Sequence, residues 1–369
     1  MAPKDAHNSY GLKGAEDTGT KDSGSNTAPA EPHNSYGLKG AEDTGTKDSG
    51  SNTAPAEPHN SYGLKGAEST GVKDSKRRYV SPDTEDLSVA SLFSFSDYNC
   101  LVTGGATGLG EMAAQAFVQN GARVIIASRK ESELKKTADR LNSIGPGRCE
   151  YVVADLKDKA GCEKLVSEVK KKVDYLNVLI NNSGATWGAP YDDFPESGWD
   201  KLMALNVKSI FYTTVGLESL LLKRATADNP TRVINIASMA AISTSDVTTT
   251  ESGGLSAVGS GTYSYGPSKA ACVHLSRLQA AKLAPQHINV NVICPGVFPS
   301  RMTRFGMDTA MDALVSRQPG GRIGTPKDFA GLVLFLSGRA GAHMVGTVQE
   351  IDGGSTRTGF KTVGRDSKL

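Results

Sequence analysis

Short apolar runs alternate with segments of helical periodicity from about residue 91 onward, and no other feature constrains the fold as strongly. Strands are expected at 100–103, 123–127, 151–154, 176–180, 232–237, 287–293 and 346–351. Helices are expected at 108–120, 131–141, 159–172, 199–223, 263–283 and 328–336. Strands separated by helices pair in parallel through right-handed crossovers, and helices then cover both faces of the sheet. We therefore predict an α/β domain at 91–354 with a doubly wound parallel sheet of about seven strands.

The first 75 residues form a repeat that cannot build a core. The 26 letters at 7–32 recur at 33–58, and a shorter, altered copy occupies 59–75. Each full copy offers one Leu and one Tyr as its sizeable apolar side chains, too little to offset the entropy lost on ordering. We expect 1–75 to be a disordered tail and 76–90 a linker. The alternative is an array for binding or modification.

Composition excludes several classes of function. The 41 Lys and Arg nearly balance the 39 Asp and Glu, so no general attraction to nucleic acid is expected. No apolar run reaches the ~18 residues of a membrane span. The five cysteines and the histidines outside the repeat lack the spacing of metal ligands. We expect free buried thiols and no metal.

A glycine-rich loop follows the first expected strand and opens the first long helix. This is the layout of a Rossmann-type domain, in which backbone N–H groups at a helix N-terminus hold a pyrophosphate. The expected contacts are Gly104, Thr107, Gly108, Leu109 and Gly110. The second strand ends at Ser128, Arg129 and Lys130, where cations suit a 2′-phosphate and no carboxylate repels it. The sequence therefore favours NADP(H) over NAD(H).

Tyr265 and Lys269 are candidates for proton transfer. They lie four residues apart, so they share one face of a helix. A nearby ammonium favours the charged form of a phenol, which makes the phenol useful as an acid or base near neutral pH. Tyr263 is a weaker candidate, because Pro267 stands four residues after it.

With Asn206 and Ser238 between the glycine loop and Tyr265, the chain resembles the short-chain dehydrogenase/reductase family from about 92 to 354. The resemblance implies that Tyr265 donates the proton and that Lys269 tunes it and binds the nicotinamide ribose. It implies that Ser238 bonds the substrate oxygen and that Asn206 holds a water linking Lys269 to solvent. Further cofactor contacts that the resemblance implies are Asp155, Leu156, Asn182, Gly184, Pro295, Gly296, Val297 and Ser300.

Within this family the chain is most similar to the 3-oxoacyl reductases, including the NADPH-dependent 3-ketoacyl reductases of rhamnolipid synthesis. We therefore expect NADPH-dependent reduction of the carbonyl group of a 3-oxoacyl thioester, such as an acyl-CoA, or of a related ketone to a secondary alcohol. The alternatives are an enoyl-CoA C=C reductase, an oxidoreductase of secondary metabolism, and a non-enzymatic NADPH-binding protein. The resemblance implies a homodimer or homotetramer. An insertion at 243–261 is expected as a surface loop or a lid over the site.

The final residues Ser367, Lys368 and Leu369 match the address read by the peroxisomal import receptor. The segment 355–369 is polar and expected to be exposed, as such an address requires. We expect a peroxisomal protein, with the cytoplasm as the alternative.

Overall fold

The computed structural model describes residues 85–244 and 259–357. The repeats, most of the expected linker, residues 245–258 of the insertion and the final tripeptide lie outside this part of the chain. A short helix, α1 (Val89–Leu92), begins within the last residues of the expected linker, and the Ser88 side chain accepts a hydrogen bond from the Ser91 N–H.

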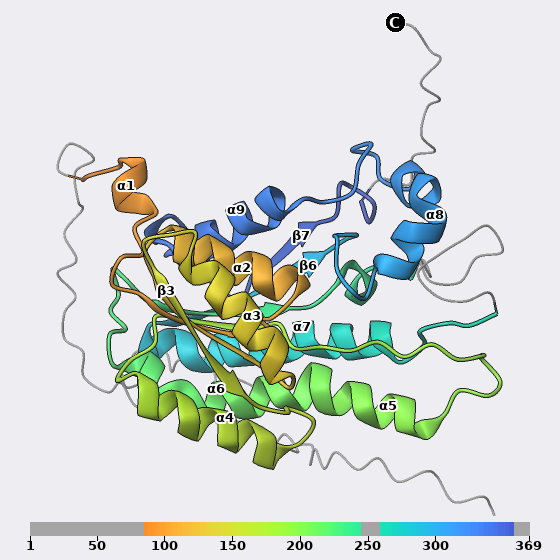
Figure 1. Cartoon of the computed structure of the whole chain (residues 1–369), viewed down its shortest axis with the longest axis horizontal. Helices are drawn as coiled ribbons and strands as arrows, with labels where there is room; N and C mark the ends of the chain where they lie inside the picture. Colours follow the sequence, from red (N-terminus) through yellow and green to blue (C-terminus); the bar gives the residue numbers. More distant parts are fainter. Residues whose placement is uncertain (1–84, 245–258, 358–369) are drawn as a thin grey trace, which may run out of the picture. The chain divides into compact units, whose positions relative to one another are not determined.

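A seven-stranded parallel sheet organises the described domain, as predicted (Figure 1). The strand order is β3-β2-β1-β4-β5-β6-β7. The bounds are β1 (Asn99–Thr103), β2 (Arg123–Ser128), β3 (Arg148–Val153), β4 (Val178–Asn181), β5 (Thr231–Ile236), β6 (Ile288–Pro295) and β7 (Val348–Ile351). The order reverses between β1 and β4, and ligands of doubly wound sheets bind beyond the carboxyl ends of the strands at such a point.

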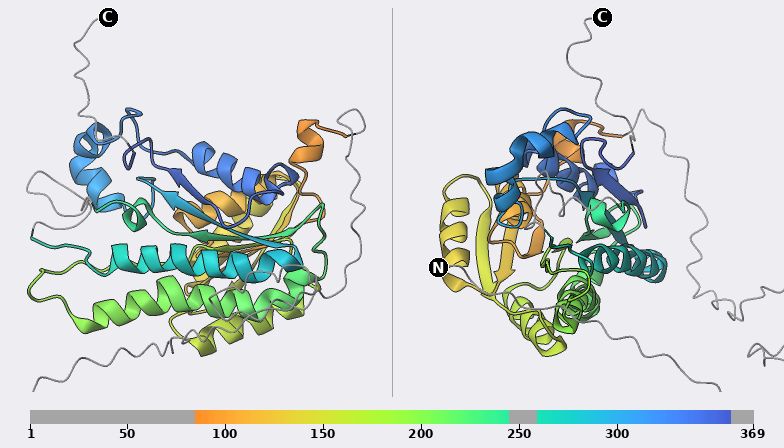
Figure 2. Two further views of the ribbon diagram at one scale, coloured as in Figure 1. Left: turned by 180° about the vertical axis from the view of Figure 1, so that it is seen from behind. Right: turned by 90° about the vertical axis from the view of Figure 1, so that its right-hand side faces the viewer.

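Helices cover both faces of the sheet (Figure 2). One face packs against α2 (Gly108–Gln119), α3 (Glu131–Asn142) and α9 (Pro326–Ser337). The other packs against α4 (Lys159–Lys172), α6 (Ser209–Leu222) and α7 (Tyr265–Leu283). Successive side chains of β1 alternate between the two cores: Cys100 and Val102 enter the first, and Leu101 enters the second. No helix of the described ranges is long and apolar enough to cross a membrane.

The helix expected at 199–223 is interrupted. The structure has α5 (Glu196–Met203), then a π-helical turn at Ala204–Lys208, then α6. The cause lies in Asn206, whose side chain bonds the backbone of Ala185 in both directions, at 2.9 and 3.0 Å. A π-turn is often found at functional sites, because it re-aims a side chain within a helix.

Two other differences are local. β3 begins at Arg148, not at residue 151, because its charged residues pair across the sheet: Arg123 lies 2.7 Å from Glu150. The helix α8 (Arg304–Ser316) was not predicted. Non-helical backbone at Ala310 interrupts it.

Candidate active site

The glycine loop is fixed to the end of β4 by Asn182. Its side-chain amide donates to the carbonyl oxygens of Thr103 and Gly104, at 3.1 Å each. In return the Thr103 hydroxyl accepts the N–H groups of Asn182 and Ser183 at 3.0 Å. Gly104 has a φ of +63°, which a side chain would strain. The loop is therefore positioned by contacts between two neighbouring strands.

A cleft of about 390 Å³ runs over this loop. Most of the predicted cofactor contacts line it: Gly104, Thr107, Gly108, Leu109, Ser128, Arg129, Lys130, Asp155, Leu156, Asn182, Gly184, Tyr265, Lys269 and Ser300. Gly110 lies behind the loop, where a Cβ would come 2.3 Å from the Gly104 carbonyl oxygen. Pro295, Gly296 and Val297 line a neighbouring cavity instead. The sequence pattern thus located the cleft, but four of the predicted residues lie outside its lining.

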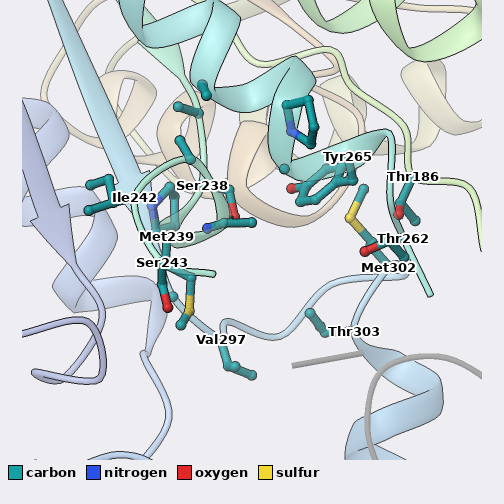
Figure 3. Close-up of a pocket in the computed structure, with 18 of the residues that line it drawn as sticks. Thr186, Ser238, Met239, Ile242, Ser243, Thr262, Tyr265, Val297, Met302 and Thr303 are labelled. Atoms are coloured by element: carbon teal, nitrogen blue, oxygen red, sulfur yellow. Dashed lines mark hydrogen bonds between the residues drawn. The ribbon is translucent and has the colours of Figure 1, made fainter. Parts of the chain in front are cut away.

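The neighbouring cavity is larger, about 690 Å³, and mostly apolar (Figure 3). Its wall includes Met239, Ile242, Val297, Phe298 and Met302. The two hollows share Leu109, Ala237, Tyr265, Ser300 and Met302. They therefore meet at Tyr265, between the more polar of the two hollows, below called the polar cleft, and the apolar cavity.

The candidate catalytic groups come from β5 and α7. Tyr265 is the first residue of α7, and Figure 3 shows its side chain directed into the cavity toward Ser238. Ser238 follows β5 and accepts the Ala240 N–H at 3.1 Å. Lys269 is buried, and its ammonium group lies 5.7 Å from the centre of the Tyr265 ring. The ammonium is held by the Ile236 carbonyl oxygen, 2.9 Å away.

Asn206 lies close to Lys269 across Gly184. A Cβ at Gly184 would be 3.3 Å from Asn206 Oδ1 and 3.4 Å from Lys269 Nζ. Both Nδ2 protons of Asn206 are used, by the Ala185 carbonyl and by the Ser268 hydroxyl at 2.9 Å. Its Oδ1 already accepts the Ala185 N–H, so one acceptor site remains for a water.

Buried thiols beside the site remain protonated. Cys272 and Cys294 pack with Ala237 in one small cluster. Burial raises the pKa of Cys294 to about 11 and also raises the pKa of Cys272. All five cysteines are buried and unpaired. Since a thiolate is the reactive form, a thiol nucleophile does not fit this site.

Thr103, Ser268 and Arg301 are among the residues at the site that were not predicted. Ser268 is fully buried and donates to the Tyr265 carbonyl oxygen at 2.7 Å. Arg301 follows β6 and lines the polar cleft. Thr103 and Ser268 lie inside the motifs that identified the site. Nothing in the sequence distinguishes their hydroxyl groups from those of other Ser and Thr residues. Within the described residues, no three His, Cys, Asp or Glu side chains gather as a metal site.

Comparisons with known proteins agree with this geometry. A family model described as "Enoyl-(Acyl carrier protein) reductase" matches residues 104–356. The rhamnolipids biosynthesis 3-oxoacyl-[acyl-carrier-protein] reductase of Pseudomonas aeruginosa is 44% identical over 264 residues, covering 71% of this chain and 97% of that protein. An NAD-dependent glycerol dehydrogenase of Listeria innocua is 31% identical over 270 residues, covering 72% of this chain and 96% of that protein.

A solved structure, the Pseudomonas aeruginosa RhlG/NADP active-site complex, matches with a TM-score of 0.65 and 43% identity. The match covers 72% of this chain and 99% of that one. The predicted resemblance is confirmed, since the family model spans more than half of the chain and a relative well above 30% identity is covered almost completely. The chain belongs to the short-chain dehydrogenase/reductase family.

Proposed function

We propose that the protein reduces the carbonyl group of a 3-oxoacyl thioester, or a related ketone, to a secondary alcohol with NADPH. One observation carries the proposal: the polar cleft and the apolar cavity meet at Tyr265. A reducing cofactor in the first and a ketone in the second would both reach the same hydroxyl. Membership of this family identifies the protein as an oxidoreductase. The substrate is the part that we propose.

The polar cleft fits a dinucleotide phosphate. The Thr107 side chain does not cap α2, so the first N–H groups of this helix remain for an anion. Gly108, with a φ of +58°, brings the backbone close to such an anion. Arg129 and Lys130 line the far end, and within the described residues Arg129 makes no ion pair. Similar proteins have been solved in complex with NADP, which supports the same choice.

The residues at Tyr265 supply the proton chemistry. When bound, NADPH would supply a hydride to the carbonyl carbon. The Tyr265 hydroxyl donates its proton to the carbonyl oxygen, which becomes the product hydroxyl. Ser238 donates a hydrogen bond to the same oxygen and orients it. The Lys269 cation favours the negative charge left on the phenol oxygen, and a water at Asn206 returns a proton.

The apolar cavity supports an acyl substrate. Its wall carries methionine, aromatic and aliphatic side chains, which suit a flexible hydrocarbon chain. Neither Lys, Arg, Asp nor Glu lines the described part of it. Ser, Thr and Tyr hydroxyls also line the cavity, so the apolar majority of its surface, and not an absence of hydrogen-bond partners, favours an acyl chain. The names of relatives from Pseudomonas aeruginosa and Thermotoga maritima point the same way.

A second candidate is reduction of a conjugated C=C bond, which the description of the matching family model favours. Product analysis separates the two. A 3-oxoacyl thioester that yields the 3-hydroxyacyl product supports our proposal. Turnover confined to the 2-enoyl thioester, with a saturated product, supports the alternative.

The test of the mechanism is Tyr265→Phe, with Tyr263→Phe as a matched control. Tyr263 also lines the cavity, but it packs edge-on against Tyr191 and Phe194. We expect Tyr265→Phe to lower kcat by at least ~10²-fold while the Kd for NADPH stays within about twofold. The control should keep most of its activity. Near-normal turnover of Tyr265→Phe would remove this phenol from the mechanism.

Two further proposals concern the whole protein. Phe211, Val215 and Leu222 are exposed along one face of α6, which supports a homo-oligomer that buries this face. Phe211→Asp should lower the mass measured by light scattering; an unchanged mass would exclude this face. Peroxisomal import through Ser367–Lys368–Leu369 stays a prediction, which localisation with and without these three residues tests.

A further inference from the structure

We propose that Arg301 is a second determinant of cofactor choice, which binds the 2′-phosphate together with Arg129 and Lys130. This inference rests on the proposed NADPH dependence. Arg129 and Lys130 follow β2, whereas Arg301 follows β6 in the other half of the sheet. All three nevertheless line the same cleft.

A shared carboxylate places Arg301 at the adenosine end of the cleft. Glu133, in the first turn of α3, lies 2.8 Å from Arg301 Nη2 and 3.6 Å from Lys130 Nζ. The pKa of Glu133 lies below its usual value, chiefly because of its hydrogen bond with Arg301. Arg301 and Lys130 therefore share Glu133 as a partner. Since Lys130 adjoins Arg129, this places the Arg301 guanidinium at the adenosine end of the cleft and not at the nicotinamide end.

The neighbouring backbone holds Arg301 over the cleft. A Cβ added at Gly108 would lie 3.1 Å from the Ser300 Cβ, so the segment carrying Arg301 passes directly over the glycine loop. Ser300 is fixed in turn by Thr303, whose hydroxyl lies 3.0 Å from its own. Arg301 thus projects from a segment that crosses the mouth of the cleft.

The charges fit a doubly charged group better than a hydroxyl. Arg129, Lys130 and Arg301 contribute three cations at this end, and Glu133 pairs with two of them. The Arg301–Glu133 pair is partly exposed, at 58% and 27% for the two side chains, so solvent weakens it and it can exchange. A phosphate offers Arg301 a stronger bidentate partner. Glu133 then acts as a competitor that NADPH must displace and NADH need not.

The test measures the Kd of NADPH and of NADH by calorimetry on the full-length protein. Arg301→Gln should weaken NADPH by about tenfold, the loss expected for one charge-assisted hydrogen bond, and NADH by less than about twofold. Glu133→Gln should tighten NADPH about twofold to fivefold, the worth of one exposed ion pair. Arg304→Gln is the matched control, because Arg304 pairs with Asp308 and does not line the cleft.

Equal weakening of NADPH and NADH in Arg301→Gln would place this residue on a part common to both cofactors and overturn the inference. Weaker NADPH binding in Glu133→Gln would also overturn it, because the carboxylate would then help and not compete. Thermal denaturation of each variant separates binding effects from misfolding. A wild-type protein that prefers NADH would instead contradict the proposed function, before any variant is compared.

Discussion

Replacing Gly110 by Ala tests how the glycine loop is held. A Cβ at this position would lie 2.3 Å from the Gly104 carbonyl oxygen and 2.4 Å from the Asn182 amide nitrogen. Ordinary contact begins near 3.4 Å, so the loop or the helix must move by about 1 Å. Neither neighbour yields easily, because Gly104 has a positive φ and Asn182 is bound to two carbonyl oxygens.

The expected cost follows from these contacts. Overpacking of this kind costs about 1–3 kcal/mol, and each hydrogen bond of Asn182 that breaks adds about 1 kcal/mol. A loss near 3 kcal/mol would lower Tm by about 5–10 °C for a domain of this size. A displaced loop also loses at least one N–H to the phosphates, which weakens NADPH binding by about 10-fold to 100-fold.

Gly331→Ala is the control for this change. Gly331 is an exposed residue of α9, and a Cβ there meets nothing within 4 Å. Alanine at this position should stabilise the protein by about 0.5–1 kcal/mol, because it restricts the unfolded chain and favours the helix. Calorimetry gives Tm and the Kd of NADPH for both variants. If Gly110→Ala matches the wild type in both quantities, the glycine is not required for close packing and our account of the loop is wrong.

Three further experiments test other parts of the structure. Ser268→Ala leaves Asn206 without one partner and should lower kcat about tenfold while the Kd of NADPH is unchanged; steady-state kinetics and calorimetry separate the two. Asp328→Asn removes the capping box of α9 and the pair with Arg322, which should cost about 1 kcal/mol at pH 7. The hydrogen bond from Arg322 depresses the pKa of Asp328, so this contribution exists above the unfolded pKa of about 4 and should shrink in urea unfolding at lower pH. Burial raises the pKa of Cys149 to about 12, and iodoacetamide should therefore label it only as fast as the protein opens.

The sheet and its helices could be predicted because their signals are local. Every strand of the sheet was expected near its observed position, since buried parallel strands read as short apolar runs between helices. The interruption at Asn206 could not be predicted in the same way. It depends on hydrogen bonds with Ala185, 21 residues away, and helical periodicity carries no trace of such a contact.

The residues of the candidate site also fall into two groups, those within local motifs and those placed by contacts between distant segments. The glycine loop and Tyr265 belong to contiguous motifs, so the spacing of the residues within each motif predicts them. Arg301 lies in the stretch Pro299-Ser-Arg-Met-Thr, but its role at the site could not be predicted, because its carboxylate partner Glu133 lies on a helix from the opposite half of the sheet. Only the fold brings these two side chains to one cleft. The sequence around Arg301 does not indicate that Glu133 will be its neighbour.

This distinction matters for how cofactor choice is encoded in the chain. The end of β2 supplies Arg129 and Lys130, and it is the position from which preference is usually argued. In this structure a third cation comes from beyond β6, and a carboxylate of α3 partly neutralises the group. A change at Arg129 alone therefore leaves two cations for a 2′-phosphate. Preference for NADPH is a property of the assembled cleft, so converting it to NADH requires changes in both halves of the sheet.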